Sequence, residues 1–195
     1  MFDIRKLALC AALLCSAGGL ALAQTAPASG PAPAKAPRKF MTLTSPAFED
    51  SAVIPPKYDG VETGITPPLS WINTPAGTQS FTLLLHDLEP APMHNTADIT
   101  HWLVFNVPGT TTSLPEGIKA GAQLPDGTIQ AKNVRGIPGY MGPEAPPPLY
   151  HHYVFELYAL DTKLSLGPDA TRAQIMEAMQ GHVLGKAVLV GRQHS

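Results

Sequence analysis

The sequence predicts a mostly β domain in which two sheets are stacked. Several short segments are apolar or alternate between apolar and polar residues, as strands do. Proline and glycine are abundant, with 21 and 17 of the 195 residues, and proline breaks helix interiors. One convincing helical pattern occurs, near the C-terminus. Strands joined by proline-rich loops, with a few short helices, are typical of an antiparallel β-sandwich.

The predicted strands can be taken in chain order. Residues 40–44 alternate apolar and polar side chains, which is typical of a half-buried strand. Residues 80–86 are mostly apolar, so this strand is expected at the centre of a sheet. Residues 101–107 predict another apolar strand, and residues 150–160 predict a long alternating one. Residues 186–191 are expected to close the domain as its last strand.

The predicted helix follows Thr171. Thr171 and Gln174 fit a capping box, in which the threonine caps the helix and the glutamine reaches back. An apolar stripe at helical spacing follows: Ile175, Ala178 and Met179. Gly181 is a plausible stop signal. We expect the apolar residues of 175–184 to be core, the alternative being a surface that pairs with a second copy of the chain.

Residues 1–23 predict a secretory signal peptide. Arg5 and Lys6 precede an apolar run, and the run ends at the small-x-small cleavage pattern Ala21-Leu22-Ala23. Glycines interrupt the run, and it is short of the roughly 20 apolar residues that span a membrane, which disfavours a transmembrane anchor. We therefore expect cleavage before Gln24, no transmembrane segment afterwards, and a periplasmic or secreted protein.

Cleavage would leave a chain without thiols, because Cys10 and Cys15 both lie in the signal. A lipoprotein anchor at Cys15 is disfavoured, since Leu14 is bulky where that signal needs a small residue. The mature protein would need no disulfide and would have no cysteine-based zinc site or nucleophile. Residues 24–39, rich in Ala and Pro, predict a flexible tether, and residues 40–195 predict a single domain.

The charge balance excludes one class of partner. The formal net charge is −2, and only 14% of residues are charged. Binding along a nucleic-acid backbone requires clustered Lys and Arg, so we expect no nucleic-acid partner. The 44% of apolar residues is enough for a core and argues against a disordered chain.

Ionisable side chains collect at the ends of three predicted strands. They are His86, Asp87 and Glu89 after the first, His101 at the start of the second, and His151, His152 and Tyr153 at the start of the third. Strand ends lie at the rim of a sandwich, where loops can enclose a cleft. A carboxylate orients an imidazole and favours its protonated form, and imidazole N–H groups donate to anions. The pattern predicts either an anion site, which would weaken as pH rises, or histidines with structural roles only.

Four motifs in a fixed order contain most of these ionisable residues. They are Asp87-Leu-Glu89-Pro, His101-Trp-Leu-Val-Phe-Asn106, Gly139-Tyr-Met-Gly142-Pro143-Glu-Ala-Pro-Pro147 and His151-His-Tyr153-Val-Phe-Glu-Leu-Tyr158. Together they resemble the phosphatidylethanolamine-binding protein family, most closely its bacterial Raf-kinase-inhibitor-like branch. The resemblance covers roughly residues 40–192. It implies a β-sandwich with a small rim pocket that binds phosphate-like anions, including the head group of phosphatidylethanolamine.

The resemblance also implies which residues bind the ligand. They are Asp87, His101, Gly142, Pro143, His151 and Tyr153, with Glu89 and His152 as further candidates. Leu88 and Glu89 replace a proline and an acid of the family's acidic segment, and His152 stands where the family commonly has Arg. Leu149 lies near a common Gly position, which predicts a narrower or more apolar pocket lip. These departures bear on the choice of ligand more than on the fold.

We therefore expect a non-enzymatic binding protein without cofactor or metal, whose ligand is a phosphate-like anion or a phosphoethanolamine head group. Family members also bind other proteins, which implies a possible periplasmic protein partner, and bacterial members are often homodimers. Two alternatives remain: a metal-assisted hydrolase, and a protease inhibitor or assembly protein that uses the same pocket. The hydrolase alternative rests on ligand types suited to zinc, but neither His-Glu-x-x-His nor Gly-x-Ser-x-Gly is present.

Overall fold

The computed structural model describes residues 39–60, 64–89 and 98–194. The predicted signal peptide and nearly all of the predicted tether lie outside these described residues, so both stay predictions. Within the described ranges, no helix is both long and apolar enough to cross a membrane.

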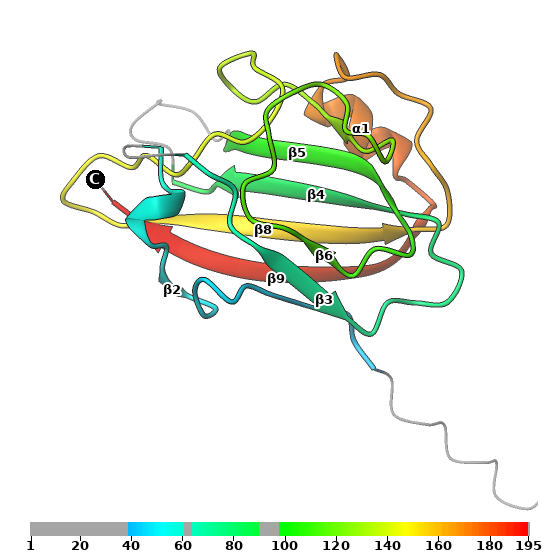
Figure 1. Ribbon diagram of the computed structural model, residues 1–195, viewed down its shortest axis with the longest axis horizontal. Helices are drawn as coiled ribbons and strands as arrows, with labels where there is room; N and C mark the ends of the chain where they lie inside the picture. Colours follow the sequence, from blue (N-terminus) through cyan, green and yellow to red (C-terminus); the bar gives the residue numbers. More distant parts are fainter. Residues whose placement is uncertain (1–38, 61–63, 90–97, 195) are drawn as a thin grey trace, which may run out of the picture. The chain divides into compact units, whose positions relative to one another are not determined.

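The described residues form two β-sheets (Figure 1). In order across the larger sheet, its strands are β2 (Ala52–Val53), β9 (Val183–Gln193), β8 (His151–Leu160), β4 (Ser80–Asp87), β5 (Ile99–Pro108) and β7 (Ile129–Gln130). Those of the smaller sheet are β1 (Thr42–Thr44), β3 (Leu69–Ile72) and β6 (Ser113–Leu114). Neighbouring strands are antiparallel except for the short β2, which pairs in parallel with β9. The predicted sandwich is confirmed, and this pair is the exception to its antiparallel order.

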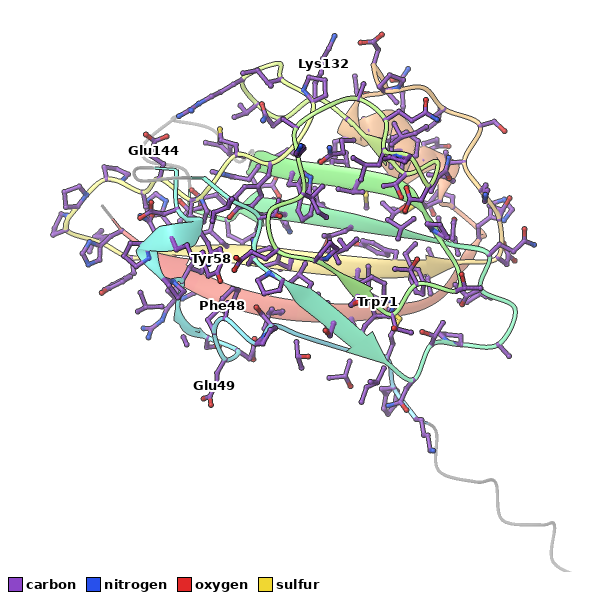
Figure 2. The ribbon with its side chains drawn as sticks, in the orientation of Figure 1. Phe48, Glu49, Tyr58, Trp71, Lys132 and Glu144 are labelled. Carbon is purple, nitrogen blue, oxygen red and sulfur yellow. The ribbon has the colours of Figure 1, made fainter. Side chains whose placement is uncertain are left out.

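The main core lies between the two sheets, with the smaller sheet in front of β8 and β9 in Figure 1. Trp71 on β3, labelled in Figure 2, meets Phe81 of β4 edge to face, with ring centroids 5.1 Å apart. Along β8, Tyr153, Phe155 and Leu157 all belong to this core. Alternate residues of a strand point to opposite faces, so the neighbours of these core residues face the other side of the sheet.

The central strand of the larger sheet is β4, and every one of its residues is buried. Its apolar run therefore has the position that the sequence predicts. Leu85 faces the smaller sheet, whereas Leu84 belongs to a second core cluster on the opposite face. Because β4 has protein on both faces, its C-terminal residues, His86 and Asp87, are also buried and are held in fixed positions.

The second core cluster lies under α1 (Arg172–Ala178). The capping box is present: Gln174 N donates to Thr171 Oγ1 at 3.2 Å, and Thr171 N donates to Gln174 Oε1 at 2.8 Å. Ile175 and Met179 are buried in the cluster, as expected for core residues. The prediction was wrong for the end of the same segment, since residues 183 and 184 reach the surface on β9.

The remaining helical turn, η1 (Pro56–Tyr58), lies near the candidate site. The Tyr140 hydroxyl donates to the Tyr58 carbonyl at 2.6 Å, which ties the loop before β8 to the end of η1. Burial is the main cause that raises the pKa of Tyr140, so its hydroxyl keeps its proton for this bond. Two segments far apart in the sequence are thereby fixed to one another beside the ends of β4 and β8.

Candidate functional site

Three strands bring their ends to one edge of the larger sheet. Asp87 ends β4, and the strands on either side of it run antiparallel to it, so both begin at this edge. Asp87 is aligned with Ile99 of β5 on one side and with Tyr153 of β8 on the other. The sheet register therefore assembles the candidate residues, which are up to 66 positions apart between Asp87 and Tyr153 (153 − 87).

A pocket of about 230 Å³ lies at this edge. Its polar lining consists of Asp87, His101, Arg135, Glu144, His151 and Tyr153, and its apolar lining of Ile99, Val134, Met141 and Pro146. Glu144 is labelled in Figure 2, on the loop that precedes β8. Four of the six predicted ligand-binding residues thus line one cavity.

Asp87 is the centre of the hydrogen bonding in this pocket. Its side chain is buried, and its Oδ2 lies 2.8 Å from Nδ1 of His151. Its Oδ1 accepts a hydrogen bond from the backbone N–H of Glu89 at 2.8 Å. The carboxylate therefore fixes the His151 ring with Nδ1 toward Asp87 and leaves Nε2 for a ligand.

His101 is held differently, by backbone carbonyls. Its Nδ1 lies 3.1 Å from the Met141 carbonyl and 3.2 Å from the Gly142 carbonyl, so Nδ1 carries a proton. Its ring meets Tyr153 edge to face at 5.1 Å. Burial is the main cause that lowers the pKa of His101 below its ordinary value. The histidine that the carboxylate was expected to orient is therefore His151 and not His101.

Tyr153 places a hydroxyl in the pocket. Its oxygen accepts a hydrogen bond from the backbone N–H of Glu144 at 3.1 Å. Burial first, and then the neighbouring charge of Asp87, raise the pKa of Tyr153. The hydroxyl therefore remains protonated at physiological pH and can donate as well as accept.

Gly142 and Pro143 do not belong to the pocket lining; they hold the loop behind it. A Cβ on Gly142 would lie 2.4 Å from both the Asp59 carbonyl carbon and the Gly60 nitrogen. The Pro143 carbonyl accepts a hydrogen bond from Gly60 N at 2.8 Å. The glycine thus permits close contact between two loops, and that contact presents the Gly142 carbonyl to His101.

The two further candidates lie beside the pocket rather than in it. Glu89 lines a neighbouring pocket of about 310 Å³, which shares Pro146 and His151 with the first. Its Oε2 accepts hydrogen bonds from the His152 backbone N–H at 2.8 Å and from His152 Nδ1 at 2.7 Å. The His152 hydrogen bond is the main cause that lowers the pKa of Glu89.

The two leucine departures also lie outside the first pocket. Leu149 is 71% exposed and lines the neighbouring pocket, so it does not narrow the first one. Leu88 is 52% exposed and lines neither. The predicted narrower lip is therefore wrong for the pocket that contains Asp87.

Arg135 is a lining residue that the sequence patterns did not predict. Its guanidinium pairs with the Glu144 carboxylate at the pocket, and about half of its side chain is exposed. It brings a permanent positive charge to the rim. A single arginine in a Gly/Pro-rich loop carries no periodic signal, so only the fold could place it.

The His, Asp and Glu side chains considered as zinc ligands do not converge on one point. His86 faces away from the pocket and contacts Asp98 and, at 3.8 Å, Glu156. In the part of the chain that the structure describes, no three His, Cys, Asp or Glu side chains form a group that could hold a metal ion. The hydrolase alternative therefore gains no support from the arrangement of these residues.

The chain is similar to several known proteins. Residues 44–194 match the family model described as phosphatidylethanolamine-binding protein. A UPF0098 protein of Methanothermobacter thermautotrophicus is 43% identical over 151 residues, which cover 77% of this chain and 97% of the relative. LppC of Mycobacterium tuberculosis, which carries the name of a lipoprotein, is 36% identical over 171 residues, covering 87% of this chain and 78% of the relative.

Solved structures also resemble the chain. A phosphatidylethanolamine-binding protein homologue of Chlamydia trachomatis, CT736, has a TM-score of 0.72 and 35% identity, covering 80% of this chain and 98% of the homologue. Escherichia coli YbcL, described as a member of the mammalian family of such proteins, has a TM-score of 0.70 and 25% identity. The match covers 80% of this chain and 99% of YbcL.

Proposed function

Because the chain belongs to the phosphatidylethanolamine-binding protein family, we propose that it binds a small phosphate-bearing anion in the pocket at the ends of β4, β5 and β8. The observation that carries this proposal is the buried Asp87–His151 pair, with His101 and Tyr153 beside it in one cavity. Such a set offers oriented imidazole and hydroxyl groups to the oxygens of a tetrahedral anion.

The hydrogen-bond donors at the pocket support an anion in a defined position. Arg135 lies at the rim, where its guanidinium pairs with Glu144. A protonated His151 can donate through Nε2 to the ligand while Nδ1 donates to Asp87, so both of its N–H groups are used. The Tyr153 hydroxyl, which keeps its proton at neutral pH, lines the same pocket.

The size of the pocket limits the ligand. A volume of about 230 Å³ is below the roughly 300–1,000 Å³ of pockets that hold drug-sized molecules. Phosphate or a phosphoethanolamine head group is of suitable size, whereas acyl chains would have to remain outside. We therefore propose recognition of a head group or a free small anion, and not enclosure of a whole lipid.

We further propose that the protein acts by binding and not by catalysis, outside the cytoplasm. The predicted signal peptide and the lipoprotein name of its relative LppC support a secreted or periplasmic place. Regulation of a partner protein in that compartment and formation of a homodimer remain part of the proposal.

N-terminal sequencing of the protein expressed from Met1 tests the proposed cleavage. The first residue of the secreted protein should be Gln24, and a retained Met1 would contradict secretion by cleavage.

Calorimetric titration with inorganic phosphate tests the proposed function. Asp87→Asn keeps the size of the side chain but removes the charge that orients His151, so affinity should fall by about tenfold or more. Asp161→Asn is the matched control, because Asp161 lies 2.7 Å from Nδ1 of His182 in an exposed pair at the far end of β8. Absence of phosphate binding by the unmodified protein, or equal affinity in Asp87→Asn, would contradict the proposal.

A further inference from the structure

Three polar groups of the pocket lining carry hydrogen-bond acceptors. Two are carboxylates: Asp87, which is buried and pairs with His151, and Glu144, which pairs with Arg135. The third is Nε2 of His101, because two carbonyl oxygens take the proton on Nδ1. An anion without a proton has only hydrogen-bond acceptors. Its oxygens could therefore form no hydrogen bond with the acceptors of the pocket lining.

The surroundings of His101 favour its neutral form. Its polar neighbours on the loop before β8 are carbonyls, and its neighbour on β8 is the Tyr153 ring. Asp87 on β4 attracts a second proton only at a distance, because its oxygens bond His151 and Glu89 N. Arg135 opposes that proton, and burial is the largest cause that lowers the pKa of His101. Nε2 therefore keeps its lone pair.

The charged side chains of the lining also favour a ligand that carries a proton. Asp87 and Glu144 carry negative charge, and Arg135 carries the single permanent positive charge among the described lining residues. Arg135 is already paired with Glu144. A doubly charged anion would add repulsion from Asp87 in a partly desolvated site, whereas a singly charged ligand with a proton of its own reduces this cost.

We infer that the pocket selects a phosphate monoester in its singly charged, protonated form, whose P–OH donates a hydrogen bond to Nε2 of His101. This inference rests on the proposed function and names the ligand class for the same site. The remaining phosphate oxygens accept from His151, Tyr153 and Arg135. A phosphate diester, which is how phosphate is linked in a phospholipid, has no P–OH at neutral pH and therefore binds more weakly than a monoester.

Methyl phosphate and methyl sulfate form a matched pair of probes. At pH 6.5 the lowered pKa of His101 leaves its ring mostly neutral. A phosphate monoester, whose second pKa is about 6, is then roughly one quarter monoanion with one P–OH, and its affinity is expressed for that monoanion. Methyl sulfate has nearly the same shape and charge but no proton. Methyl phosphate should bind about tenfold more tightly or better, because methyl sulfate leaves a buried acceptor unsatisfied. Equal affinity for both, or tighter binding of methyl sulfate, would overturn the inference.

A comparison of monoesters with a diester identifies the chemical class of the natural ligand. Phosphoethanolamine and a short phosphoserine peptide are monoesters, and glycerophosphoethanolamine is the corresponding diester. We expect both monoesters to bind more tightly than the diester, and the tighter monoester indicates a small-molecule or a protein source. If the diester binds as tightly as the monoesters, the inference fails while anion binding stands. If none of the probes binds, the proposed function fails as well.

A variant and a spectroscopic measurement test the role of His101 directly. In His101→Gln, whose amide can turn either a donor or an acceptor toward the ligand, the preference for methyl phosphate should fall to about twofold or less. Asp161→Asn should keep the full preference. Nitrogen-15 NMR of the unmodified protein at pH 7 gives a test that needs no variant. It should show His101 with its proton on Nδ1 and none on Nε2, and a protonated Nε2 would overturn the inference.

Discussion

At the scale of single residues, the site depends on which partner holds each histidine. Asp87 bonds His151, and two backbone carbonyls bond His101, so two rings that look equivalent in the sequence are held by different partners. The residues Asp87, His101, His151 and Tyr153 could be predicted because each stands at a strand end or in a motif. Arg135 could not, because its position depends on how a loop returns to the sheet.

Gly142 shows that a motif residue can be needed for a reason other than ligand contact. Gly142→Ala should destabilise the fold by roughly 1–3 kcal/mol, since its Cβ would lie 2.4 Å from backbone atoms of Asp59 and Gly60, which cannot rotate away. Chemical denaturation measures this change. Gly167→Ala is the control, because a Cβ there meets nothing within 4 Å. Equal stability of the two variants would refute the role given to Gly142.

At the scale of elements, long apolar or alternating runs were predicted well. Among the described short strands, β1 lies within the segment predicted at 40–44, whereas β2, β3, β6 and β7 were not predicted. The segments expected at 80–86, 101–107, 150–160 and 186–191 correspond to β4, β5, β8 and β9, with bounds that differ by up to three residues. In contrast, β3 has four residues, and β2, β6 and β7 have two each. Such short strands are formed by pairing with a neighbour, and a local pattern carries too few residues to reveal them.

The capping box makes α1 sensitive to one side chain. Thr171→Ala removes the oxygen that accepts from Gln174 N, and should lower the free energy of unfolding by about 1 kcal/mol. Thermal unfolding with circular dichroism detects this change. Thr171→Ser retains the hydroxyl and should stay within a few tenths of a kcal/mol of the unmodified protein. If serine destabilises as much as alanine, the hydroxyl is not the stabilising group.

At the scale of the whole molecule, the sandwich assembles a site that no single segment contains. The antiparallel order of β5, β4 and β8 brings residues 87, 101, 151 and 153 to one edge, and the loop carrying Gly142 adds Met141, Glu144 and Pro146 to the lining. The sequence predicted the fold class and the participants. It could not predict the distances between them, because register and loop packing depend on contacts across the entire domain.

Burial of a neutral His101 also links the site to global stability. An ordinary histidine has a pKa of about 6.5, and the folded protein lowers that of His101, so the unfolded chain binds more protons in the interval between the two values. This contribution to stability is complete above about pH 7.5 and is lost as pH falls through that interval. His101→Gln should therefore reduce the loss of stability as pH falls below about 7, by up to ~1.4 kcal/mol for each pH unit within that interval.

Denaturant unfolding at a series of pH values measures this slope. Above about pH 7.5, where histidine is neutral in both states, the difference between the two proteins should be constant and serves as the internal reference. An unchanged slope in His101→Gln would mean that the ring does not remain neutral on folding.

The most direct test of the central claim is an NMR titration of residues 24–195 with phosphate and then phosphoethanolamine, repeated on His151→Ala. We predict saturable shifts at His101, Arg135, His151 and Tyr153 that disappear in the variant. Absence of saturable shifts with both ligands, or shifts elsewhere that persist in His151→Ala, would contradict the assignment of this pocket as the anion site.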